Sequence, residues 1–151
     1  MQLSSFLLSA SLLAVLGGCA AAPKHVTQSA SSQTFTPCSI APHCVSSQAD
    51  HGIHYVAPFS YTGSAQHARA ALLQTLRSSG SASVEEADNG IVHATFRSTV
   101  GFVDDVTFAI KPEQNIIDVK SSSRIGFYDL GVNGRRVERL RARFEALLKG
   151  S

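Results

Sequence analysis

The chain has 151 residues, enough for one domain and too few for two of ordinary size. Its net charge of +2 does not point to any class of partner. The charge is unevenly distributed, because the segment 131–151 carries six basic residues against two glutamates while the remainder is net negative.

The segment 1–18 has the features of a signal peptide. It contains no charged side chain, and the run from Phe6 to Leu16 is almost purely apolar. This run has the length of a signal-peptide core and is shorter than the roughly 20 residues that a membrane-spanning helix requires. The basic residue usual near the start of a signal peptide is missing. No later segment has the pattern of a transmembrane helix.

The tetrapeptide Leu16–Cys19, LGGC, resembles a bacterial lipobox, in which an aliphatic residue and two small residues precede a cysteine. We therefore expect lipidation of Cys19, the alternative being an ordinary signal peptide with a chance cysteine. Two or three acyl chains would anchor the protein stably in a membrane. Ala20 stands where an aspartate would resemble an inner-membrane retention signal. The expected location is therefore the outer membrane, with the protein facing the periplasm.

The segment 19–36 is rich in Ser, Thr, Ala and Gln, which predicts a flexible tether before a single domain at 37–151. The close pair Cys38 and Cys44 predicts a disulfide in an oxidising compartment. A metal site with His43, His51 and His54 is the alternative, although the cysteine spacing is not that of structural zinc. No cofactor is expected.

The remaining elements follow from hydrophobic periodicity and turn residues. A short strand is expected in the segment 52–59. A helix follows, capped by Ser64 and ended by Gly80. Strands at 81–87 and 91–99 flank a hairpin turn at Asp88, Asn89 and Gly90. The list is completed by strands at 104–110 and 116–123 and a helix at 133–148.

This order predicts an α+β domain in which two helices pack on one face of an antiparallel sheet of four to five strands. The order of strand, helix, four strands and helix matches a TBP-like topology. That match is an analogy of fold and carries no function.

Two adjacent carboxylates lie on the predicted strand 104–110. Neighbouring residues of a strand point to opposite faces, so Asp104 and Asp105 are not expected to line one site together. Asp104 shares the face of the apolar residues and is expected to be buried, which requires a cation or donors. Arg124, at the end of an antiparallel strand, is the candidate partner for either aspartate. Asp129 or Asn133 is expected to cap the last helix.

Two interpretations of the polar stretch around 121–136 remain open. In the first, it is a structural connector between a strand and a helix, held by an Arg–Asp bridge and caps. In the second, Arg124, Arg135, Arg136 and the free amides of a helix N-terminus bind a small anion such as phosphate or carboxylate.

Four motifs in this order resemble a family of proteins of unknown function, DUF1499: CSIAPHCVSS, GFVDDVTF, SSSRIGFYDLGVN and a following arginine, Arg136. The resemblance spans about residues 37–148. His43, Thr107, Lys120, Ser122 and Gly134 depart from the family pattern. The positions that keep it are Cys38, Cys44, Ser46, Ser47, Asp104, Asp105, Ser121, Ser123, Arg124, Gly126, Asp129, Gly131, Asn133 and Arg136. The resemblance implies motifs and a domain boundary, and no reaction.

Enzyme motifs are missing from the sequence, including the nucleophile elbow, the zinc-protease helix, the P-loop and the dinucleotide fingerprint. The first hypothesis is therefore a non-catalytic envelope lipoprotein that binds a protein partner or a small anion at the membrane. The alternative is an envelope hydrolase that uses Asp104, Asp105 or Asp129 with a histidine or a metal. An envelope location disfavours nucleic acid as a partner.

Overall fold

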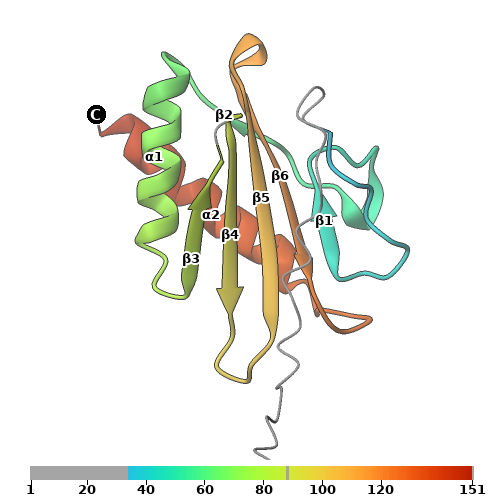
Figure 1. The fold of residues 1–151 in the computed structure, drawn as a ribbon. Helices are drawn as coiled ribbons and strands as arrows, with labels where there is room; N and C mark the ends of the chain where they lie inside the picture. Colours follow the sequence, from blue (N-terminus) through green and yellow to red (C-terminus); the bar gives the residue numbers. More distant parts are fainter. Residues whose placement is uncertain (1–33, 88, 151) are drawn as a thin grey trace, which may run out of the picture.

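The computed structural model describes residues 34–87 and 89–150. They form one antiparallel sheet with two helices on one of its faces, so the predicted α+β class is confirmed (Figure 1). The elements in chain order are β1 (Cys44–Ser46), the 3₁₀ turn η1 (Gly52–His54), β2 (Phe59–Ser60), α1 (Ala65–Arg77), β3 (Ala82–Glu86), β4 (Ile91–Arg97), β5 (Val103–Lys111), the 3₁₀ turn η2 (Pro112–Gln114), β6 (Ile116–Ser123) and α2 (Val132–Lys149).

The sheet has the strand order β1-β6-β5-β4-β3, and β2 also pairs with β6. All of these pairings are antiparallel. The strands from β3 to β6 therefore form the predicted meander. In Figure 1, α1 lies beside β3 at one edge, while α2 crosses behind the strands. The β4–β5 turn and the β6–α2 connection lie at the same end of the sheet (Figure 1).

The predicted first strand at 52–59 is wrong in most of its length. The chain turns at Gly52, which has a φ of 83°, and forms η1, so the pairing with the sheet is reduced to a parallel bridge of Tyr55 with Ser46 and to the strand Phe59–Ser60. The sheet instead gains β1, whose three residues begin with the disulfide cysteine Cys44. A strand of three residues is too short to give a detectable alternation of polar and apolar side chains.

The helix ends follow the prediction in part. The Ser64 side chain accepts a hydrogen bond from the His67 amide at 3.1 Å, which confirms the predicted cap of α1. Gly80 does not end the helix as expected, because α1 ends at Arg77 with Ser78 as its C-cap. The hydroxyls of Ser78 and Ser79 each donate to the Thr75 carbonyl at 2.9 Å, which satisfies a carbonyl of the last turn without a left-handed glycine.

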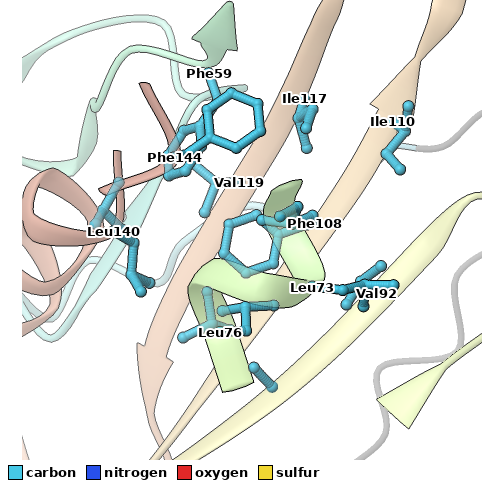
Figure 2. Close-up of a cluster of buried hydrophobic side chains, with 14 of the residues drawn as sticks. Phe59, Leu73, Leu76, Val92, Phe108, Ile110, Ile117, Val119, Leu140 and Phe144 are labelled. Atoms are coloured by element: carbon cyan, nitrogen blue, oxygen red, sulfur yellow. The ribbon is translucent and has the colours of Figure 1, made fainter. Parts of the chain in front are cut away.

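The main core lies between the helices and the sheet (Figure 2). Phe59 packs near Phe108 and Phe144, with ring centroids 5.7 and 5.5 Å apart, so β2 joins the sheet to α2. The alternation of β5 and β6 places Val106, Phe108, Ile117 and Val119 in this core, and each of them is fully buried. Burial of one apolar stripe per helix and one apolar face per sheet is what holds such a two-layer domain together.

A second, smaller cluster lies on the opposite face of the sheet. Phe35 is 4% exposed and packs with Ile91 and Ala109. Its amide donates to Gln48 Oε1 at 2.7 Å, and Lys120 Nζ donates to the Thr36 carbonyl at 2.7 Å. Phe35 and Thr36, at the C-terminal end of the predicted tether, thus contact the folded domain.

Cys38 and Cys44 form the predicted disulfide, with a Cα–Cα distance of 5.6 Å. It fastens the N-terminal segment to β1. The predicted signal peptide and the lipidation site Cys19 lie outside the described residues, as does Asp88 of the hairpin turn. Within the described residues, the helices are too short or too polar to cross a membrane.

Candidate functional site

Asp104 and Asp105 point to opposite faces of the sheet, as strand geometry predicts. In the register of β5 and β6, Asp104 lies opposite Ser123 and Asp105 lies opposite Ser122. Asp104 is 5% exposed on the side of the helices, while Asp105 is half-buried on the other side. The two carboxylates therefore belong to different environments and different partners.

The partner of Asp104 is Arg136, and the prediction that Arg124 pairs with it is wrong. Arg136 Nη2 donates to Asp104 Oδ2, and its guanidinium lies 4.9 Å from the centre of the Phe96 ring. The side chains of the pair are only 11% and 7% exposed. The desolvation cost of a buried charge pair is offset by the close contact of the two charges and by further hydrogen bonds. Removal of one partner would leave the other charge buried and uncompensated.

Arg124 instead pairs with Asp105 through two parallel hydrogen bonds. Arg124 Nε lies 2.7 Å from Oδ2, and Nη2 lies 2.8 Å from Oδ1. This bidentate contact with Asp105 raises the pKa of the Arg124 guanidinium. The two side chains are 26% and 35% exposed, so water screens this pair more than the one formed by Asp104. Arg124 thus bonds one of the two aspartates named as its possible partners.

Asn133 is the centre of the buried network. It is fully buried in the first turn of α2, and its amide nitrogen donates to Ser123 Oγ at 2.9 Å, to Asp129 Oδ2 at 2.8 Å and to the His43 carbonyl at 3.1 Å. Its oxygen accepts from Ser121 Oγ and from Arg136 Nη1. One side chain therefore joins β6, α2 and the segment before β1.

Asp129 holds the connection between β6 and α2. Its carboxylate accepts from the Gly131 and Asn133 amides, each at 2.8 Å. Burial alone would raise the pKa of Asp129, but these hydrogen bonds and the one from the Asn133 side chain outweigh burial and lower the pKa. The prediction that Asp129 or Asn133 is the cap of α2 is wrong, because Gly131, with a φ of 73°, is the N-cap residue; Asp129, two residues earlier, supplies acceptors to the first amides.

Ser46 and Ser47 belong to a separate polar cluster on the other face of the sheet, centred on Asp118. Asp118 is 4% exposed and accepts from Ser47 Oγ at 2.8 Å, from Gln48 Nε2 at 2.7 Å and from Lys111 Nζ at 2.8 Å. Burial would raise the pKa of Asp118, but these partners outweigh burial and lower the pKa from its ordinary value. Sequence reasoning missed this residue, although an aspartate between Ile117 and Val119 signals a polar contact on the second face.

The metal alternative finds no support among the described residues. Both candidate cysteines are in the disulfide, and His54 Nδ1 lies 2.9 Å from the Cys44 carbonyl. The described part of the chain contains no group of three or more His, Cys, Asp or Glu side chains placed to hold a metal ion.

The connection that this network holds presents large apolar side chains to solvent. Ile125, Phe127, Tyr128 and Leu130 are between 63% and 77% exposed, and we call them the apolar loop. Leu130 has a φ of 54°. Asn115 is the other non-glycine residue at positive φ in the described chain, and asparagine tolerates that conformation far better than leucine.

The sequence model of DUF1499, described as a protein of unknown function, matches residues 34–144. The chain belongs to this family. The match includes Phe35 and the disulfide, both polar clusters, the apolar loop and most of α2. Searches of the curated proteins and of the solved structures found no match.

Proposed function

We propose that this DUF1499 protein is a lipid-anchored, non-catalytic envelope protein whose domain binds a protein partner through the apolar loop. The main support for this proposal is the contrast between two neighbouring sets of side chains. The polar residues before and after the loop are bonded to one another, while the apolar residues of the loop contact solvent.

The three aspartates proposed for a hydrolase are engaged in contacts within the protein, which favours a binding function over hydrolysis. Asp104 is paired with Arg136, Asp105 with Arg124 on the opposite face, and Asp129 accepts backbone amides. A hydrolase would need such groups to converge on one open position, with a base and a place for substrate. The hydrolase alternative therefore has less support than the binding proposal.

The composition of the loop favours a protein partner. Exposed aromatic side chains supply much of the binding free energy at protein interfaces, and a fixed loop loses little entropy on binding. Phe127 and Tyr128 are 72% and 63% exposed, and Asp129 fixes the backbone that follows them. Leucine at position 130 costs about 1–2 kcal/mol in the left-handed conformation. This cost is understandable if the Leu130 side chain contributes to a contact.

The anchor rests on the sequence at 1–19, where an apolar run is followed by LGGC. Lipidation of Cys19 would keep the domain close to the membrane, which limits its partners to proteins of the same compartment.

Site-specific photo-crosslinking in cells that carry the full chain tests this proposal. A photoreactive residue at Phe127 should give a discrete protein adduct, and Leu130→Asn in the same chain should strongly reduce it. The same probe at Gln66, which is exposed on α1, is the matched control and should give no such adduct. Adducts of equal yield at both positions, adducts to lipid alone, or none at Phe127 would overturn the proposal.

A further inference from the structure

A groove on the side of the helices is lined by arginine and serine residues from three separate elements. Its volume is about 390 Å³, and it lies between the α1–β3 connection, the end of β4 and the middle of α2. The residues that define it here are Ser79, Ser81, Arg97, Ser98, Arg139 and Arg143, and we call it the arginine groove.

The charge of the groove is positive and largely uncompensated. Four arginines line it and no aspartate or glutamate does. Arg136 is the innermost of the four and is neutralised by Asp104. Within the described residues, Arg97, Arg139 and Arg143 form no ion pair. Other basic residues of α2 are engaged elsewhere, since Arg135 donates to the Leu130 carbonyl and Arg141 to the Ala57 and Pro58 carbonyls.

The polar surroundings suit an oxyanion. Arg143 Nη1 donates to Ser79 Oγ at 3.1 Å, which holds one guanidinium at the edge of the groove. The end of α1 brings the partial negative charge of its last carbonyls near the groove, and Ser78 and Ser79 satisfy one of them by donating to the Thr75 carbonyl. Guanidinium groups match the geometry of phosphate oxygens through paired N–H donors.

We propose that the arginine groove binds a ligand that carries a phosphate group. Arg139 and Arg143 lie one turn apart on α2, line the groove and have no carboxylate partners among the described residues, which favours a doubly charged group over a single carboxylate. The groove has room for more than the phosphate, and Phe96 and Leu140 supply an apolar wall for an organic part. This site differs from the predicted anion site, because Arg124 and Arg136 are paired and Asp129 occupies the helix amides. It is independent of the apolar loop.

The test is calorimetric titration of the full chain, purified in a neutral detergent, with inorganic phosphate and with glycerol 3-phosphate. Arg139→Gln and Arg143→Gln should each weaken binding by about tenfold or more, since each removes charged hydrogen bonds. The matched control Arg69→Gln also removes one positive charge, but Arg69 pairs with Glu86 outside the groove and should leave the affinity unchanged.

A second arm distinguishes the two sources of the phosphate. Co-sedimentation with phosphatidylglycerol vesicles that depends on Arg139 and Arg143, without binding of the soluble phosphates, would assign the groove to a lipid headgroup. Binding of a soluble phosphate that depends on the same arginines would assign it to a soluble ester. Absence of both, or equal weakening by Arg69→Gln, would overturn the proposal.

Discussion

Asp104 and Asp105 are neighbours in the chain but experience different forces. Asp104 faces the helices and pairs with the buried Arg136. Asp105 faces the opposite side of the sheet and pairs with the partly exposed Arg124. The identity of a residue therefore says little about its role until the face of its strand is known. The same holds for the arginines of α2, of which Arg136 is 9% exposed and Arg139 is exposed.

Two aspartates link the stability of the domain to pH. Hydrogen-bond partners lower the pKa of both Asp118 and Asp129 from the ordinary value of an aspartate in the folded protein. A carboxyl whose pKa is lower in the folded state stabilises the fold above its unfolded pKa, and this stabilisation is lost as pH falls through the folded pKa. The free energy of unfolding should therefore decrease below about pH 4.

Removal of one of these carboxylates should weaken the pH dependence. Asp118→Asn should lower the free energy of unfolding at pH 7 and reduce its further loss between about pH 4 and pH 2, as measured by urea denaturation across that range. Glu113→Gln, on the exposed turn after β5, should keep the wild-type profile. An unchanged acid limb in Asp118→Asn would contradict the role assigned to this cluster.

At the scale of elements, the β6–α2 connection combines a fixed backbone with an unfavourable residue. Leu130→Asn should leave the melting temperature unchanged or raise it, because asparagine tolerates positive φ better than leucine. The gain should be at most about 1–2 kcal/mol. Thermal unfolding followed by circular dichroism measures it, with Leu148→Asn, a half-buried position on α2, as the destabilising control. A clear loss of stability in Leu130→Asn would show that the leucine is needed for packing.

The disulfide joins Cys38, in the segment before β1, to Cys44 of β1 across a short loop. Replacement of Cys38 and Cys44 by serine should cost about 2 kcal/mol in the chain-entropy model, since the separation is only 6 residues. In this variant, hydrogen exchange should be faster at the Phe35 amide than at the amides of β5. Mass spectrometry of the wild-type protein should find both cysteines oxidised, and two free thiols would contradict the structure.

The elements that sequence reasoning predicted are those with long periodic patterns. The meander from β3 to β6 was predictable because each strand alternates and each turn has its own residues. The strand β1 was not, because it has three residues, and Phe35 was not, because it is a single aromatic in a Ser/Thr-rich segment. The pairing of Arg124 with an aspartate followed from the sheet register. The pairing of Arg136 with Asp104 did not, because it requires knowing how α2 crosses the sheet.

At the scale of the whole molecule, the proposed position at a membrane depends on one cysteine. Cys19→Ala should leave an unprocessed precursor, because the thiol is the group that would carry the diacylglyceryl unit. Immunoblots of membrane and soluble fractions measure this, with Cys38→Ala as a control that keeps the lipidation site. Normal maturation and membrane sedimentation of Cys19→Ala would rule out the lipid anchor.

We infer that the polar network from Asp104 to Arg136 stabilises the fold. Two substitutions three residues apart on α2 test this inference. Arg136→Met leaves Asp104 buried without its cation and should lower the free energy of unfolding by about 3–5 kcal/mol. Arg139→Met, on the exposed face, should change it by less than about 0.5 kcal/mol. Arg124→Met should fall between them, at about 1 kcal/mol, because its pair is partly exposed.

Urea denaturation of these variants is the most direct measurement. If Arg136→Met does not fold, the double variant with Asp104→Asn should recover stability, since it removes the uncompensated charge. The predicted order of destabilisation is Arg136→Met, then Arg124→Met, then Arg139→Met. Wild-type stability in Arg136→Met would contradict the structural role assigned to the network.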